Sequence, residues 1–290
     1  MPHPGWAAFS FDGIGTSWEV STPGPLEDGR RRRLLGVVEE YDAAWSRFRT
    51  DSTVARAARQ PGRFIMPDGA GALGRLYRSL YRLTDGAMTP LVGGSLEQLG
   101  YDPAYSLRPR GIPLPAPRWD DVLDWQDAVL TTTAPVVLDV GAAGKGQLAD
   151  LLAAELRAQG VGEHFIDASG DLLNSGPAAV TVGLEHPYDP GRAIGTISLG
   201  TGALCASAAN RRAWGDGLHH VLDGTTGKPV STVVATWALA GDAMTADALA
   251  TALFFVSGKA LQQDFEFSWL TVFSDGSAAY SAGFEGVLFE

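Results

Sequence analysis

Large apolar side chains follow a helical period in the first half of the chain. They recur every three or four residues from Leu34 to Phe48 and again from Leu73 to Leu83, which predicts two amphipathic helices. The second helix should end at Asp85-Gly86, because glycine is a common helix stop. A strand is expected before the first helix, over Gly13–Val20. The four prolines between Arg108 and Trp119 predict an extended surface excursion.

Strand-like and helix-like segments alternate in the second half. The predicted helices cover Gln147–Gln159 and Ala243–Val256. The predicted strands are Pro135–Val140, Glu163–Ala168, Ala179–Leu184, Ile194–Leu199, His219–Leu222, Thr232–Leu239, Trp269–Phe273 and Ala278–Gly283. This alternation predicts an α/β (α+β) fold. Because no linker rich in Pro, Ser and Gly divides the middle, we expect residues 1–290 to form a single domain.

Composition narrows the range of partners. A formal charge of −11 argues against nucleic acid or an anionic membrane as a partner, since both require clustered Lys and Arg. Cys205 is the only cysteine, so an intrachain disulfide and a thiolate metal cluster are excluded. The N-terminal residues lack a basic and then apolar signal pattern, and no run of 18 apolar residues occurs, so we expect a cytoplasmic protein.

A glycine-rich turn precedes the predicted helix at 147–159. The segment DVGAAGKGQLAD, residues 139–150, can bring backbone N–H groups close to phosphate oxygens. It is not a Walker loop, because Asp139 stands at the position of the first glycine and Lys145 is followed by Gly146. A plain turn between a strand and a helix is the alternative interpretation.

Two oxygen-bearing side chains share one face of the predicted helix at 243–256. Asp247 and Thr251 are four residues apart, and oxygen ligands of low total charge suit magnesium, which keeps water and phosphate as its other ligands. Alternatively, Asp247 is a helix cap or a hydrogen-bonded carboxylate of the core.

Two further segments combine polar groups with tight turns. HHVLDGTTGKPV, residues 219–230, places His220 near an Asp and a glycine turn, and a histidine suits proton transfer near neutral pH. FIDASGDLLNSG, residues 165–176, ends a strand in a turn of small residues. A structural histidine and a turn in which Asp171 bonds to local backbone are the alternatives.

Together, the order and spacing of these segments resemble the ApbE family of FAD:protein FMN transferases. The matching segments are GIGTSWEV (13–20), WSRFRTDS (45–52), TDGAMTPLVG (84–93), DVGAAGKG (139–146), DASGD (167–171), HHVLDGTTG (219–227), ADALATAL (246–253) and SAGFEG (281–286). The resemblance implies duplicated β-α-β elements with mixed, mostly antiparallel sheets. It also implies Mg²⁺-dependent transfer of FMN from FAD to a Thr or Ser hydroxyl of an acceptor protein, with release of AMP. FAD hydrolysis to FMN and AMP, and FAD binding without turnover, are the alternatives.

The resemblance also assigns expected roles to individual residues. Magnesium would be held by Asp247, Thr251 and the backbone oxygen of Ala142, with His220 as the candidate base and Lys145 offsetting phosphate charge. The positions expected to contact FAD are Ile14, Phe48, Ala87, Met88, Thr89, Asp139, Lys145 and Leu222.

Three segments depart from the usual pattern of the family. Met88-Thr89-Pro90-Leu91 stands where GAFDPT is usual, so an aromatic ring and a carboxylate are lost. DASGD at 167–171 replaces NAGGD and adds a carboxylate, and DGTTG at 223–227 replaces DPRTG and removes an arginine. These changes alter the charge expected around the nucleotide but leave Asp247 and Thr251 in place.

Overall fold

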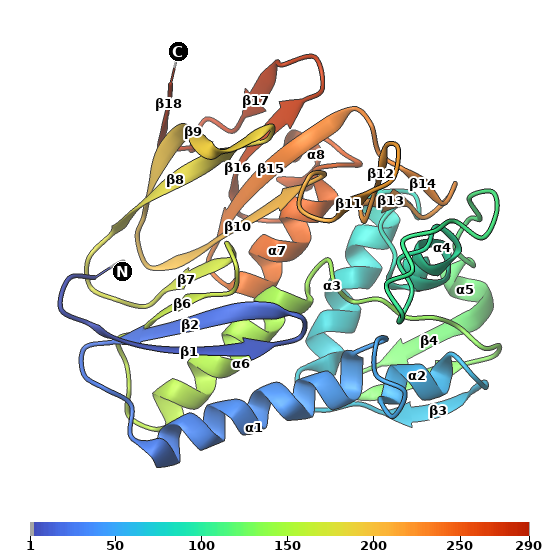
Figure 1. Cartoon of the computed structure of the whole chain (residues 1–290), viewed down its shortest axis with the longest axis horizontal. Helices are drawn as coiled ribbons and strands as arrows, with labels where there is room; N and C mark the ends of the chain where they lie inside the picture. Colours follow the sequence, from blue (N-terminus) through green and yellow to red (C-terminus); the bar gives the residue numbers. More distant parts are fainter. Residues whose placement is uncertain (1–2, 290) are drawn as a thin grey trace.

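An eight-stranded antiparallel sheet runs through the computed structural model, which describes residues 3–289 (Figure 1). Its strand order is β1-β2-β6-β7-β10-β15-β16-β17. The strands are β1 (Ala7–Gly13), β2 (Thr16–Thr22), β6 (Phe165–Asp167), β7 (Leu172–Asn174), β10 (Gly202–Ala208), β15 (Val233–Ala240), β16 (Ser268–Phe273) and β17 (Ala278–Tyr280). The predominantly antiparallel sheet and the mixture of helices and strands confirm the predicted fold class.

Four longer helices gather beside this sheet in Figure 1. They are α1 (Asp28–Trp45), α3 (Ala70–Leu83), α6 (Gly144–Ala158) and α7 (Ala243–Ala252). The shorter helices are α2 (Thr53–Ala57), η1 (Pro90–Val92), α4 (Gly93–Gln98), α5 (Trp119–Val122) and α8 (Gly258–Leu261). The long helices bury aliphatic side chains such as Leu34, Leu73, Leu152 and Leu249 in one core with the facing side of the sheet. Removing these apolar side chains from water is the main stabilising contribution.

The sheet consists of two halves with the same order of elements. In the first half, the paired strands β1 and β2 are followed by helices ending with α6 and then by the paired strands β6 and β7. In the second, β10 and β15 are followed by α7 and then by β16 and β17. The two halves meet where β7 pairs with β10 and where α6 packs against α7.

The segments that connect these strands form smaller sheets. β8 (Val180–His186), β9 (Asp189–Leu199) and β18 (Gly286–Leu288) form a three-stranded sheet, and their apolar side chains make a second core with Trp237 and Leu270 of the main sheet. A second three-stranded sheet contains β3 (Gly62–Ile65), β4 (Leu123–Gln126) and β5 (Val129–Thr132). Two short hairpins pair β11 (Ala213–Trp214) with β12 (Leu218–His219) and β13 (Leu222–Asp223) with β14 (Lys228–Pro229).

Of two further predicted strands, the one at 13–20 is confirmed in part, since β2 covers Thr16–Thr22, and the one at 135–140 is wrong. The segment at 13–20 is interrupted by the turn between β1 and β2, where Ile14 and Gly15 have φ values of 45° and 78°. Residues 135–140 are extended and largely buried but join no sheet; instead, Asp139 N–H donates to the Pro90 carbonyl at 2.8 Å. Apolar periodicity reports burial, and here the buried segment bonds to the ends of the short helices α2 and η1 and packs into the main core without pairing with a strand.

Several predicted boundaries are also too long. The helix expected to reach Val256 ends at Ala252, and the strand expected at 219–222 is two separate pairs of residues around His220 and Val221. The prediction for the proline-rich segment is confirmed, since residues 108–118 contain neither helix nor strand.

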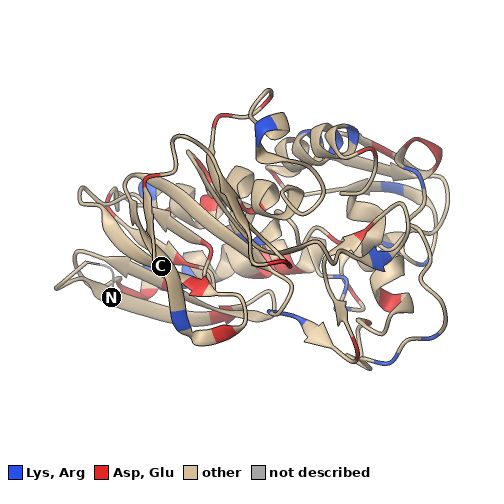
Figure 2. Ribbon diagram, turned by 90° about the horizontal axis from the view of Figure 1, so that it is seen from above, with Lys and Arg blue, Asp and Glu red and all other residues tan. Residues whose placement is uncertain are grey.

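Charged residues are interspersed along the chain in Figure 2, with Lys and Arg dispersed among Asp and Glu. Among residues 3–289, no helix combines the length and apolar character needed to cross a bilayer.

Candidate active site

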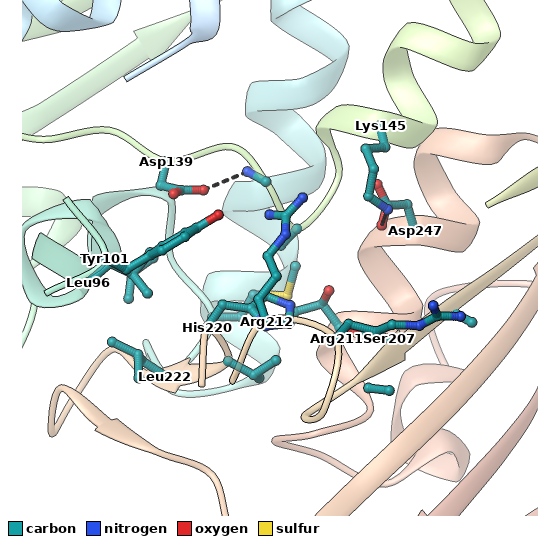
Figure 3. Close-up of a pocket in the computed structure, with 18 of the residues that line it drawn as sticks. Leu96, Tyr101, Asp139, Lys145, Ser207, Arg211, Arg212, His220, Leu222 and Asp247 are labelled. Carbon is teal, nitrogen blue, oxygen red and sulfur yellow. Dashed lines mark hydrogen bonds and ion pairs between the residues drawn. The ribbon is translucent and has the colours of Figure 1, made fainter. Parts of the chain in front are cut away.

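A cavity of about 300 Å³ opens beside the first turn of α6 and the middle of α7 (Figure 3). Its wall comes from turns and strand ends far apart in sequence, including residues 87–89, 139–145, 206–208 and 220–222. Two adjoining cavities, of about 150 and 250 Å³, lie under the turn between β1 and β2. The three share wall residues, so they lie side by side and are together called the cleft.

All of the residues predicted from the sequence to form a site border this cleft. The main cavity is lined by Ala87, Met88, Thr89, Asp139, Ala142, Lys145, His220, Leu222, Asp247 and Thr251. Ile14 and Phe48 line both of the adjoining cavities. Their individual binding and catalytic roles remain predictions.

Lys145 lies between two buried carboxylates. Its Nζ is ion-paired with Asp171, and it is 3.8 Å from Oδ1 of Asp247, toward which it points in Figure 3. Asp171 also accepts a hydrogen bond from the Ala206 N–H at 3.2 Å, and Asp247 Oδ2 accepts one from the Gly146 N–H at 2.9 Å. Within residues 3–289, Oδ1 of Asp247 accepts no hydrogen bond, and the more distant Lys145 is its one ion-pair partner.

Glycine at position 146 allows the two helices to approach at this point. A Cβ atom there would lie 2.0 Å from the Ala243 carbonyl oxygen and 2.8 Å from Cβ of Asp247. The absence of a side chain therefore brings the first turn of α6 against α7 and permits the hydrogen bond to Asp247. This packing explains why glycine follows Lys145 where a Walker loop would have Ser or Thr.

Asp139 is held by a buried arginine that the sequence did not single out. Arg47 Nε donates to Asp139 Oδ2 at 2.6 Å, and the Gly141 N–H donates to Oδ1 at 2.7 Å. Although burial raises the pKa of Asp139, Arg47 and the hydrogen bonds lower it more, so the carboxylate is ionised. Arg47 also donates to the Tyr101 carbonyl and lies 4.2 Å from the centroid of the Phe48 ring.

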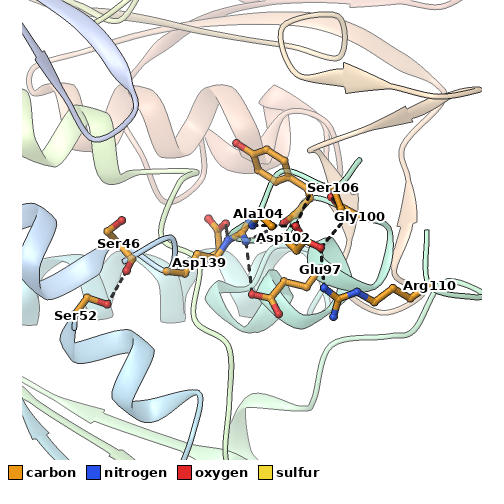
Figure 4. A network of polar contacts seen from close by, with 11 residues as sticks. Ser46, Ser52, Glu97, Gly100, Asp102, Ala104, Ser106, Arg110 and Asp139 are labelled. Carbon is orange, nitrogen blue, oxygen red and sulfur yellow. Dashed lines mark hydrogen bonds and ion pairs between the residues drawn. The ribbon is translucent and has the colours of Figure 1, made fainter. Parts of the chain in front are cut away.

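The loop that follows Tyr101 is fixed by a second polar network (Figure 4). Asp102 accepts hydrogen bonds from the Ala104 N–H, from the N–H and hydroxyl of Ser106, and from Arg110 at 2.7 Å. The bonds from Ser106 are the main reason that the pKa of Asp102 is lowered to about 2. The network positions Tyr105, whose ring stacks on Phe48 with centroids 5.0 Å apart. This wall of the cleft is therefore preorganised.

The two adjacent histidines have different environments. Both ring nitrogens of His219 are engaged, with the Val230 carbonyl at 2.9 Å and the Val221 N–H at 3.3 Å, so His219 is structural. His220 faces the cavity, and its Nδ1 has no hydrogen-bond partner among residues 3–289. Burial, followed by the charge of Arg212, lowers the pKa of His220 to about 3. The ring is therefore neutral at physiological pH and able to accept a proton.

Sequence reasoning missed several other wall residues. Arg47, Tyr101, Arg211 and Arg212 all border the cleft, while Asp171 was interpreted only as a local turn residue. None of them belongs to a periodic helix or strand pattern in the sequence, because each lies in a loop or at the end of a helix or strand. For Asp171, the one available signal was its place at the end of a tight turn that follows a buried strand.

The sequence profile of the ApbE family matches residues 14–266. This match covers most of the chain. The chain belongs to the ApbE family.

Individual ApbE proteins are also similar to this chain in sequence and in structure. Proteins named FAD:protein FMN transferase from Rhodobacter capsulatus and Vibrio cholerae are 28% and 26% identical over 266 and 243 residues, which cover 84% and 75% of this chain. The matches cover 50% and 70% of those proteins, so the chain spans about half the length of the first relative. The ApbE protein of Thermotoga maritima superposes with a TM-score of 0.81 at 25% identity, over 97% of this chain and 99% of that one. The flavin transferase ApbE of Vibrio cholerae superposes with a TM-score of 0.78 at 21% identity, over 95% and 96% of the two chains.

The oxygen atoms of this ApbE chain fit a hard divalent cation that is also bound by a ligand's phosphates. Asp247, Thr251 and Ala142 line the same cavity and offer a carboxylate, a hydroxyl and a carbonyl oxygen. No cluster of three or more His, Cys, Asp or Glu side chains able to hold a metal occurs in the part of the chain from 3 to 289. One carboxylate with neutral oxygens is characteristic of Mg²⁺, which keeps water and phosphate oxygens as remaining ligands.

Proposed function

We propose that this chain catalyses the Mg²⁺-dependent transfer of FMN from FAD to a Thr or Ser hydroxyl of an acceptor protein, with release of AMP. The observation that carries the proposal is the convergence of Asp247 Oδ1, Lys145 and His220 on one cavity that adjoins two aromatic-walled cavities. A cleft of this shape suits a ligand with rings at its ends and phosphates between them. The names of the ApbE relatives support the same activity.

The proposal assigns a separate role in the reaction to each residue of the cavity. Asp247, Thr251 and the Ala142 carbonyl would hold magnesium, which supplies charge neutralisation for the diphosphate and the leaving group. Lys145 offers a positive charge beside them. The acceptor oxygen forms a bond to the FMN phosphorus, while the bond from that phosphorus to the oxygen of AMP breaks and AMP leaves with the bonding electrons.

His220 is the proposed base of this reaction. Its unpartnered Nδ1 and neutral ring allow it to take the hydroxyl proton as the new bond forms. The low pKa in the empty cavity makes it a weak base, but negatively charged phosphates bound nearby would raise that pKa. Proton transfer would therefore be favoured only when the substrate is present.

Product analysis tests the proposal. Purified protein is incubated with FAD and Mg²⁺, with and without a domain that carries a family-type acceptor threonine, and both AMP and the acceptor mass are measured. We expect an increase in acceptor mass equal to one FMN, matched by AMP and abolished by EDTA. AMP and free FMN without acceptor modification would instead identify a FAD hydrolase. Bound FAD with no AMP under any condition would reject catalysis and leave a flavin-binding protein.

A further inference from the structure

The charged residues that line the main cavity are nearly all neutralised by a partner. Asp139 pairs with Arg47 at 2.6 Å, Lys145 pairs with Asp171, and Arg211 pairs with Glu185 at 2.8 Å. Asp247 has a hydrogen bond from Gly146 and faces the proposed cation with its other oxygen. A paired cation offers less attraction to an incoming anion, since its charge is already compensated.

Arg212 is the exception. No carboxylate, carbonyl or hydroxyl partner is found for its guanidinium among residues 3–289. In Figure 3 its side chain extends into the space between Tyr101 and the Lys145–Asp247 pair, while Arg211 extends in a different direction. The cavity therefore presents a cation that has no ion pair or hydrogen bond among residues 3–289, although its charge also helps to lower the pKa of Asp139.

The position of Arg212 is also distinctive. It lines the main cavity and both adjoining cavities, and no other residue from 3 to 289 lines all three. A ligand that extends from one cavity into another would lie beside Arg212, which belongs to the wall of all three. In a dinucleotide, the rings lie at the two ends and the diphosphate lies between them, so the middle of the ligand would meet Arg212.

The nearby turn at 223–227 supplies no cation of its own. Thr225 is exposed, and its hydroxyl donates to Asp223 Oδ1 at 2.6 Å. Lys228, which follows the turn, is exposed and does not line any of the three cavities. A guanidinium can bind two phosphate oxygens at once through its planar fork of N–H groups, which an ammonium group cannot do.

From these observations, which extend the proposed function, we propose that Arg212 binds the diphosphate of FAD and selects dinucleotides over flavins without a diphosphate. Lys145 remains tied to Asp171 and Asp247, and Arg212 is the residue that meets the bridging phosphates. Because Arg212 touches the ligand's phosphates directly, its contribution should appear in binding before any chemistry occurs.

Binding measurements without metal test this inference. Dissociation constants of FAD, FMN, riboflavin and ADP are determined by flavin fluorescence or calorimetry for the unaltered protein, Arg212→Ala, Arg212→Lys and the neighbouring control Arg211→Ala. We expect Arg212→Ala to raise the dissociation constants of FAD and ADP at least tenfold and to change that of riboflavin less than twofold. Arg212→Lys should recover part of the loss because it keeps the charge, and Arg211→Ala should change FAD binding less than threefold. Thermal melting checks that each variant is folded.

The outcomes separate this inference from the proposed function. Unchanged FAD and ADP affinities in Arg212→Ala, or an equal loss of riboflavin, would overturn the role of Arg212 while leaving the flavin transferase proposal intact. An effect of Arg211→Ala as large as that of Arg212→Ala would overturn it too. If the unaltered protein binds ADP but not FAD, the proposed function fails, whereas a loss of ADP binding in Arg212→Ala would still support the diphosphate contact. Absence of binding to both would overturn the role of Arg212, and the product analysis with Mg²⁺ would then decide the proposed function.

Discussion

The backbone N–H of Gly146 donates to Oδ2 of Asp247 at 2.9 Å, although the two residues are 101 positions apart in sequence. This bond directs the other oxygen of Asp247 toward the cavity and joins the first turn of α6 to α7.

Replacing Gly146 with alanine should disrupt this contact. The new Cβ would overlap the Ala243 carbonyl oxygen, so we expect a loss of about 2–3 kcal/mol in the free energy of unfolding and a severe loss of activity. Gly36→Ala in α1 is the matched control, because a Cβ there meets nothing within 4 Å and should stabilise the helix by about 0.5–1 kcal/mol. Urea denaturation of both variants measures the contrast. Equal effects would show that the helix contact is looser than described.

Asp247→Asn should separate metal binding from folding. The amide keeps an oxygen that can accept from Gly146 but loses the negative charge, so metal-dependent AMP release should fall on the order of 100-fold or more. The affinity for Mn²⁺, measured by electron paramagnetic resonance in the absence of FAD, should fall together with the rate of AMP release. Asp264→Asn, at an exposed position, serves as the control. Unchanged Mn²⁺ affinity in Asp247→Asn would exclude this carboxylate as a ligand.

His220→Gln should slow transfer by about 10²–10⁴-fold without a comparable change in FAD affinity, because the base acts only in the chemical step. The lowered pKa of His220 also predicts its effect on pH dependence. The His220 ring becomes protonated only near pH 3, whereas an ordinary histidine has a pKa of 6.5. The fall in kcat/KM that protonation of His220 causes at low pH should therefore begin well below pH 6.5. Initial rates between pH 4.5 and 7.5 test this. A matched loss of thermal stability and rate would indicate a structural histidine.

Ile14→Asn should have opposite effects on stability and binding. Ile14 has a φ of 45°, a conformation that is costly for a β-branched residue and favourable for asparagine in a two-residue hairpin turn. We expect a gain of about 1 kcal/mol in stability. Because the apolar side chain lines both adjoining cavities, FAD binding should weaken by about tenfold. The melting temperature reports the change in stability, and fluorescence titration reports the change in FAD binding. Tighter FAD binding would contradict the prediction that Ile14 contacts FAD.

Acid should destabilise the fold through His164. Burial lowers the pKa of this fully buried histidine to about 4 from an ordinary value of 6.5. The unfolded chain therefore binds a proton that the folded chain does not, and stability should fall as the pH drops from 6.5 to 4, by on the order of 3 kcal/mol. Asp150 acts in the opposite direction, since burial raises its pKa to about 6. Urea unfolding of His164→Gln should show a smaller loss between pH 7 and 4.5, and an identical loss would contradict this role.

The sequence predicted the helices better than the sheet. Apolar periodicity located α1, α3, α6 and α7, because each buries one long face. The same rule failed at 135–140, where buried apolar residues join the main core without pairing with a strand. It also missed the turn after Gly13, where isoleucine occupies a position usually given to asparagine or glycine. Local patterns report burial and propensity but not the partner of a strand.

The missed wall residues have a different cause. Arg47 and Arg212 are single charged residues in loops, and their importance depends on which carboxylates lie nearby in three dimensions. Arg47 donates its hydrogen bond to Asp139, 92 positions later, whereas the proposed role of Arg212 rests on its having no such partner among residues 3–289. Neither relationship is visible in the spacing of residues.

The division of the sheet into two halves has a consequence for synthesis on the ribosome. Asp139 and Lys145 belong to the first half, but Asp247 and Thr251 lie on α7 of the second, within the last fifty residues of the 290. A nascent chain therefore carries an incomplete cleft until both halves of the sheet and α7 have been translated. The complete site cannot assist the folding of the first half during translation, and binding at that site stabilises only a chain that has both halves.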